Sequence, residues 1–186
     1  AKFFVAGSKK EGNFHVVDSE HRGLAALDAV TAIVIAEGYA TADTLSQALS
    51  CPVVAAFDSG NLLKVAQVLQ KKYPQKPIVI AGDDDLTQES INGKNPGKEK
   101  AMEAAQLVNG AVVLPIFAPG EQMSQQLSDF NDLANKSVLG IEAVKRQVGS
   151  VVEKVSQQAK QDSLLKLQVP IEPKQQEIKQ KRALVR

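Results

Sequence analysis

The chain has 186 residues, a net charge of +1, 44% hydrophobic residues and only 4% aromatic residues. This length predicts one domain with a short appendage, and the composition suffices for an aliphatic core. A nearly neutral chain excludes a globally basic surface, so binding of nucleic acid requires a local patch or metal ions. Cys51 is the single cysteine, which excludes an intramolecular disulfide and a cysteine-based zinc cluster. We expect it to be a buried small side chain.

The apolar runs of the sequence are short. The longest, Ala32–Ala36 with its neighbours, is far below the run of about 20 residues that spans a bilayer. The amino-terminal residues also lack the pattern of a secretory signal peptide. We therefore expect a cytoplasmic protein with no membrane partner.

The predicted elements begin with two short apolar runs, 3–6 and 14–17, which a Gly/Lys loop separates into a hairpin-like pair of strands. The run at 31–36 (TAIVIA) is rich in β-branched residues, which is typical of a strand buried on both faces. The elements expected after it are a helix at 41–49, a buried strand at 52–57, a helix at 61–73, a strand at 78–81, a helix at 97–108 and a strand at 111–114.

The last part of the chain predicts one long helix and a polar tail. The helix is expected over 136–165, with an apolar stripe of Val138, Ile141, Val144, Val148, Val151, Val152 and Val155. This stripe could pack on the sheet or contact another domain. From residue 168 the composition shifts to Gln, Lys, Glu and Pro, which indicates a basic linker or tail that could also touch phosphate backbone.

Strands and helices alternate along the chain with connections too long for hairpins. The fold class predicted is therefore α/β, with a mostly parallel central sheet of about four strands flanked by helices. In such sheets, functional groups gather at the carboxyl ends of the strands. Glu37 follows the first central strand, Asp58 the second and Asp83 the third. These polar residues should therefore meet at one edge of the sheet.

The acidic run Asp83-Asp84-Asp85 holds like charges close together, and these charges repel one another. Alternation along an extended chain puts Asp83 and Asp85 on one side and Asp84 on the other. We expect Asp84 to cap a turn or helix or to be solvated. Two carboxylates in this spacing, joined by Glu37, suit a hard cation such as Mg²⁺ or Mn²⁺. Glu37 could alternatively act as a general acid or base.

These residues stand in an ordered set of motifs that resembles the Toprim domain. The similarity is closest to the primases of conjugative plasmids and satellite phages. It covers about residues 2–135, with the segments EGYATADTL (37–45), AAFDSGNL (55–62), IVIAGDDD (78–85), NPGKEKA (95–101) and SDFNDL (128–133). The domains expected are a hairpin-like extension over 1–30, the Toprim domain over 31–135, the long helix over 136–167 and the tail over 168–186.

The resemblance implies roles for individual residues. Glu37 would be a general acid/base or a metal ligand, Asp83 and Asp85 would bind Mg²⁺, and Asp129 would line the metal region. Asn131 and Asp132 would continue that motif. The residues expected to bind nucleotide or phosphate are Gly38, Asn95, Gly97 and Lys98. Helix capping is an equally good interpretation of Asn95.

The resemblance also implies an activity. A Toprim primase performs Mg²⁺-dependent nucleotidyl transfer, making primers from ribonucleoside triphosphates on single-stranded DNA in plasmid replication or conjugation. Helicase or relaxase domains of a parent protein would be its partners. Two alternatives stay open at this stage. One is a Toprim nuclease, and the other is a non-catalytic Toprim module within a larger conjugative relaxase or helicase.

Overall fold

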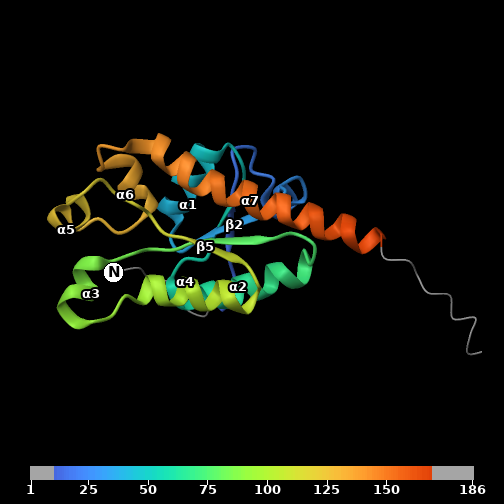
Figure 1. Ribbon diagram of the computed structural model, residues 1–186, viewed down its shortest axis with the longest axis horizontal. Coiled ribbons are helices and arrows are strands. Elements are labelled where there is room, and N and C mark those ends of the chain that lie inside the picture. Colours follow the sequence, from blue (N-terminus) through green and yellow to red (C-terminus); the bar gives the residue numbers. More distant parts are fainter. Residues whose placement is uncertain (1–10, 169–186) are drawn as a thin grey trace, which may run out of the picture.

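The computed structural model describes residues 11–168 (Figure 1). The strand expected at 3–6 and the tail from residue 169 lie outside the described residues. Five strands form one sheet in the order β1-β3-β2-β4-β5, and all neighbours are parallel except β1, which runs antiparallel to β3. The strands are β1 (His15–Val17), β2 (Ile33–Ala36), β3 (Val53–Ala55), β4 (Ile78–Ala81) and β5 (Ala111–Val113).

Helices cover both faces of this sheet, so the predicted α/β class is confirmed. The helices are η1 (a 3-10 helix, Gly23–Asp28), α1 (Tyr39–Leu49), α2 (Ser59–Lys72), α3 (Leu86–Asn92), α4 (Pro96–Leu107), α5 (Glu121–Gln125), α6 (Phe130–Asn135) and α7 (Gly140–Gln168). In Figure 1, α1, α6 and α7 lie on one side of the sheet, and α2 and α4 lie on the other.

The central strands are apolar at every position because both of their faces are buried. Along β2, Val34 and Ala36 pack with α1, α6 and α7, while Ile33 and Ile35 pack with α2 and α4. The same alternation holds in β4, whose four residues are also all buried. β2 and β4 therefore lie between two mostly aliphatic cores.

Three short helices were not predicted from the sequence. α3 lies between the strand expected at 78–81 and the helix expected at 97–108, and α5 and α6 lie between the last strand and the long helix. They have 7, 5 and 6 residues, which is too short to show helical periodicity. Capping residues define two of them, because Asp85 and Asp129 each accept a hydrogen bond from a backbone N–H in the first turn.

The long helix α7 begins at Gly140, four residues after the predicted start at Lys136. The predicted stripe was wrong at its beginning, since Val138 is 83% exposed and precedes the helix, and Ile141 is 40% exposed. Val144 and Val148 are fully buried against the sheet. After Ser156 the helix extends beyond the body of the domain (Figure 1), and the residues described there are almost all exposed. None of the helices in the range 11–168 combines the length and apolar character that a bilayer span requires.

Candidate active site at the carboxyl edge of the sheet

Three carboxylates follow three neighbouring parallel strands. Glu37 follows β2, Asp58 comes three residues after the end of β3, and Asp83 comes two residues after the end of β4. The strand ends are level, because Ala36 pairs with Ala55 on one side and with Ala81 on the other. Neighbouring strands lie about 4.8 Å apart. All three acidic residues are half-buried. The carboxyl edge therefore holds a group of acidic residues that lie far apart in the sequence.

Two glycines, Gly82 and Gly97, allow α4 to pack closely beside Asp83. A Cβ atom on Gly82 would lie 2.5 Å from the Cβ of Ala101 in α4, and one on Gly97 would lie 3.0 Å from the Cβ of Asp83. Only glycine fits at either position without displacing a neighbour. The first turn of α4 therefore packs directly against the backbone of Asp83. This contact gives Gly97 a packing role, and its predicted role in phosphate binding stays a prediction.

Asp84 was expected to cap a turn or helix or to be solvated, but the structure shows neither. Its Oδ1 accepts a hydrogen bond of 2.8 Å from Nδ2 of Asn95 and lies 3.6 Å from Nζ of Lys98. Nδ2 of Asn95 also donates to Glu89, at 2.9 Å. The backbone of Asp84 is fixed as well, because its N–H donates to the carbonyl of Ser128. This network ties the acidic loop to the start of α4.

Asn95 caps α4, as one of the two sequence interpretations proposed. Its Oδ1 accepts from the backbone N–H of Lys98 at 3.4 Å and from that of Asp85 at 3.3 Å, and the residue is only 3% exposed. Both ends of its amide are therefore used within the protein. Lys98 lies between Asp84 and Glu89 at the same edge, with its side chain one-third exposed. The predicted roles of Asn95 and Lys98 in binding phosphate stay predictions.

Asp85 and Asp129 have structural contacts of their own. Asp85 caps α3, because its Oδ1 accepts from the backbone N–H of Gln88 at 2.8 Å. Asp129 caps α6 through Oδ1, and its Oδ2 accepts from the hydroxyl of Thr41 in α1 at 3.0 Å. Thr41 was missed by sequence reasoning. It lies 88 positions from Asp129, so no local pattern could reveal the contact.

Of the two remaining residues of the α6 motif, Asn131 adds a second contact with α1, and Asp132 makes contacts next to α6 itself. Oδ1 of Asn131 accepts from the hydroxyl of Thr44 at 2.9 Å. Asp132 accepts from the backbone N–H of Ser128 and pairs with Lys136 at 2.7 Å, which raises the pKa of that lysine. This motif therefore fastens α6 to α1 beside the acidic edge. Whether it also serves a ligand stays a prediction.

The chemistry of the donor set fits a hard cation. Among residues 11–168, no three acidic, histidine or cysteine side chains converge closely enough to hold a metal by themselves. Mg²⁺ does not require such a cage, because it binds through one or two carboxylates, several waters and substrate phosphates. Glu37 and Asp83, at the ends of paired strands, supply two carboxylates of this kind. Gly38, the N-cap residue of α1, directly follows Glu37.

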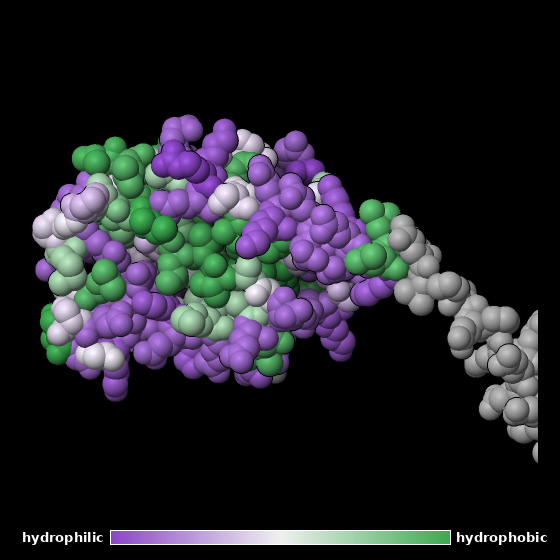
Figure 2. Space-filling view, viewed as in Figure 1, coloured by the Kyte–Doolittle hydropathy of each residue, from purple (hydrophilic) through white to green (hydrophobic). Residues whose placement is uncertain are grey.

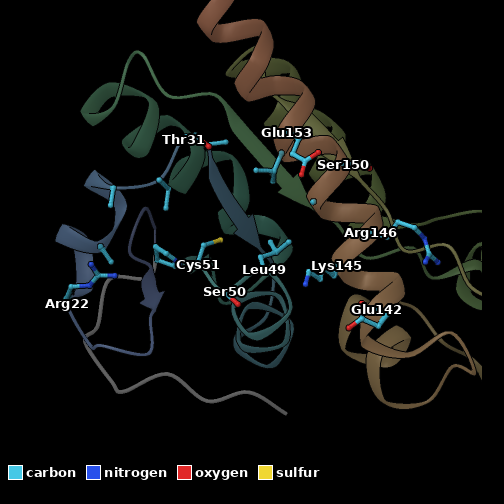
Figure 3. Close-up of a pocket in the computed structure, with 17 residues that line it drawn as sticks. Arg22, Thr31, Leu49, Ser50, Cys51, Glu142, Lys145, Arg146, Ser150 and Glu153 are labelled. Atoms are coloured by element: carbon cyan, nitrogen blue, oxygen red, sulfur yellow. The ribbon is translucent and has the colours of Figure 1, made fainter.

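A cavity of about 940 Å³ lies at the opposite, amino edge of the sheet, between η1, the end of α1 and α7. Figure 3 shows its charged side chains spread around the rim, with Arg22 and Arg146 on opposite sides. Cys51 lines it and is only half-buried, and burial raises the pKa of its thiol. This cavity offers volume without a convergent set of reactive groups.

Comparison with known proteins identifies the fold family. Residues 32–138, more than half of the chain, match the family model described as a Toprim domain. This chain belongs to the Toprim family. The Toprim match begins one residue before β2 and includes every acidic residue of the carboxyl edge described above. No solved structure matches the chain.

Two curated relatives of this Toprim chain carry the same description, DNA primase TraC from Escherichia coli. One is 39% identical over 216 aligned positions, covering 86% of this chain, and the other is 40% identical over 238, covering 98%. The chain spans only 15% and 22% of the lengths of these relatives. The predicted resemblance to primases of the Toprim type is thus confirmed. The roles of the individual residues stay predictions.

Proposed function

We propose that this Toprim domain is the nucleotidyl-transfer centre of a DNA primase that makes primers from ribonucleoside triphosphates on single-stranded DNA. One observation carries the proposal. Glu37 and Asp83 emerge at the level ends of the paired central strands β2 and β4. Similarity to proteins described as DNA primases supports it. Plasmid replication or conjugation would be its setting, with helicase or relaxase domains of a parent protein as partners.

The residues that would hold Mg²⁺ or Mn²⁺ are Glu37, Asp83 and Asp85. When bound, the metal would supply electrostatic stabilisation of the charge that develops on the transferred nucleotidyl group. Asp83 and Glu37 provide oxygen ligands from rigid strand ends, while Asp85 contributes the carboxylate oxygen not used to cap α3. Lys98 would orient a substrate phosphate at the same edge.

A divalent cation would also act on the electrostatics of this edge. Glu37, Asp58 and Asp83 follow neighbouring strands. A cation bound between their carboxylates would reduce the repulsion between like charges. We therefore expect metal binding to stabilise the folded domain, as does any ligand that binds only the folded state.

The first test measures metal binding by the chain itself. Calorimetric titration with Mn²⁺ should show binding to the wild type and an affinity at least about tenfold lower for Asp83→Asn and Glu37→Gln, since even the outer-shell partners of metal ligands have effects of this size. Asp162→Asn, an exposed carboxylate on the projecting half of α7, is the matched control. No binding by the wild type at millimolar metal would favour the non-catalytic module.

The second test measures chemistry in a longer protein that contains this domain. Primer synthesis on single-stranded DNA should be abolished by the double substitution Asp83→Asn, Asp85→Asn, and normal synthesis by this variant would contradict the proposal. Incubation with labelled DNA and Mg²⁺ without nucleotides separates the nuclease alternative. Cleavage under these conditions would favour a nuclease.

A further inference from the structure

An exposed pair of rings borders the carboxylate edge on the side of β1. Tyr39 is the first residue of α1, two positions after Glu37, and is 52% exposed. His15 begins β1 and is also exposed. Because β1 runs antiparallel, His15 pairs with Ala55 at the carboxyl end of β3. The two ring centroids lie 5.6 Å apart with the planes tilted by 39°.

Core packing does not explain this ring pair. Neither Tyr39 nor His15 belongs to the two aliphatic cores that cover the sheet. A tyrosine is a large amphipathic side chain, and exposing half of it leaves apolar ring surface in water. In a chain with 4% aromatic residues, two rings meeting in solvent beside the acidic edge are a distinctive feature. Their exposed surface is available to a third planar ring.

A cavity of about 480 Å³ adjoins the pair and includes both rings in its lining. This volume lies within the range of pockets that bind small organic ligands. Its wall along α1 carries Asp43 and Gln47, whose side chains are joined by a hydrogen bond of 2.8 Å. Amide and carboxylate groups of this kind can pair with the polar edge of a heterocyclic base. The cavity therefore combines stacking surface with hydrogen-bonding groups.

The charges around this cavity favour the base of a nucleotide, which is uncharged, over its phosphate. Its lining carries Asp18, Glu20 and Asp43. The cation Arg22 is already paired with Asp18 at 3.1 Å and with Glu20 at 3.0 Å. The remaining excess of negative charge disfavours a phosphate inside the cavity, whereas a planar base carries no charge to be repelled. A phosphate would be placed instead at the neighbouring metal edge.

We propose that Tyr39 and His15 form a stacking platform for a nucleobase, with the adjoining cavity receiving that base and the attached phosphate directed toward Glu37 and Asp83. This inference rests on the proposed function, since it names the part of the substrate that the same edge holds. Stacking on an aromatic ring tolerates any base, because every base has a π-face. Tyr39 is therefore a substrate-binding residue rather than a nucleophile.

The experiment measures binding of a short single-stranded oligodeoxynucleotide that contains 2-aminopurine, whose fluorescence is quenched by stacking. Tyr39→Ala should weaken the affinity about five- to hundredfold, the range expected for loss of one base–aromatic stack. Tyr39→Phe keeps the ring and should bind within about twofold of wild type. Met102→Ala removes an equally exposed large side chain from α4, on the other face of the sheet, and should have no effect.

Several outcomes overturn the inference. Equal affinity of wild type and Tyr39→Ala would do so, and so would a loss as large in Tyr39→Phe, because the hydroxyl would then be the group that matters. No binding by the wild type would also overturn it. Competition with ATP identifies the source of the base. Displacement by ATP assigns the platform to the free nucleotide, and competition only by unlabelled oligonucleotide assigns it to the strand.

Failure of this inference is distinguishable from failure of the proposed function. The Mn²⁺ titration depends on Asp83 and Glu37 and should be unchanged by Tyr39→Ala. Binding of the oligonucleotide without added metal depends on the rings and the adjoining cavity. Circular dichroism of the thermally unfolded and folded states verifies that Tyr39→Ala folds, which we expect because the side chain lies outside the aliphatic cores.

Discussion

The two edges of the sheet use charged side chains in opposite ways. At the amino edge, the amine of Lys76 donates to three backbone carbonyls, those of Leu27, Asp28 and Val30, at 2.7 to 2.9 Å. The same amine lies 5.8 Å from the ring centroid of Tyr73. These contacts of the charged amine hold the end of η1 in place. At the carboxyl edge, the carboxylates of Glu37 and Asp83 are instead gathered at the strand ends by the packing of α1 and α4.

This difference separates stability from function within one fold. An ionic group that satisfies backbone carbonyls contributes to the folded state, whereas the carboxylates at the strand ends are the proposed metal ligands. We therefore expect substitutions at the amino edge to change stability alone. Substitutions that move the carboxyl edge should change stability and metal affinity together.

The largest effect is expected for Gly82→Ala at the carboxyl edge. The new Cβ would lie 2.5 Å from the Cβ of Ala101, so α4 must shift away from β4 and from Asp83. We expect the free energy of unfolding to fall by about 3 kcal/mol, the upper range for overpacking, with a weaker Mn²⁺ affinity. Chemical denaturation and calorimetry measure the two quantities.

Gly149→Ala is the matched control for this substitution. A Cβ on Gly149, in the interior of α7, would lie at an ordinary 3.9 Å from Leu49. Alanine there should raise stability by about 0.5–1 kcal/mol, because glycine is unfavourable within a helix. Equal destabilisation by the two substitutions would show that close packing behind Asp83 is not what makes Gly82 necessary.

A smaller effect is expected for Lys76→Met at the amino edge. It removes three hydrogen bonds from a charged donor while keeping much of the apolar stem, and we expect a loss of about 2 kcal/mol in the free energy of unfolding. Lys71→Met, at an exposed lysine in the last turn of α2, should change it by less than about 0.5 kcal/mol. Mn²⁺ affinity should stay at the wild-type value in both. A change in the Mn²⁺ affinity of Lys76→Met would contradict the separation between the two edges.

The smallest effect is expected at Glu121, which joins α5 to the segment before α7. Its carboxylate accepts a hydrogen bond of 2.5 Å from the hydroxyl of Ser137 and one of 2.9 Å from the backbone N–H of Val138. The Ser137 hydroxyl, followed by that N–H, lowers the pKa of Glu121 below its ordinary value of 4.5. Its contribution to stability is thus complete above about pH 4.5 and is lost as pH falls through the lower folded-state pKa.

Glu121→Gln tests this pH dependence. The stability difference between wild type and variant, measured by thermal unfolding, should be constant from pH 7 to about pH 5 and shrink below pH 4.5. A difference that grows on acidification would reverse the assigned direction. The next residue, Gln122, donates to the carbonyl of Asp84 at 2.7 Å, which joins α5 to the acidic loop.

The central strands and the acidic edge could be predicted because buried parallel strands leave continuous apolar runs in the sequence. β4 (Ile78–Ala81) coincides with its predicted range, and the parallel arrangement brings Glu37, Asp58 and Asp83 to one edge. The contacts of Asp129 and Asn131 with α1 were not predictable. They join residues almost 90 positions apart, and packing of α6 against α1 creates them only in the folded chain.

Other differences have local causes. α3, α5 and α6 are single turns or little more, so a hydrophobic pattern does not predict them. For α3 and α6, the capping residues Asp85 and Asp129 are the better signal. Val138 belonged to the predicted apolar stripe but lies before α7 begins, and its backbone N–H donates to Glu121. The interpretation of Asp84 neglected its neighbour in space, Asn95, because eleven positions separate them along the chain.

The projecting half of α7 has a geometric consequence for anything joined beyond it. A helix of 29 residues extends about 43 Å, and its first half is fixed to the sheet by Val144 and Val148. Inserting one residue after Ser156 would advance the distal end by about 1.5 Å and rotate it by about 100° around the helix axis. The helix thus sets an angular phase as well as a separation.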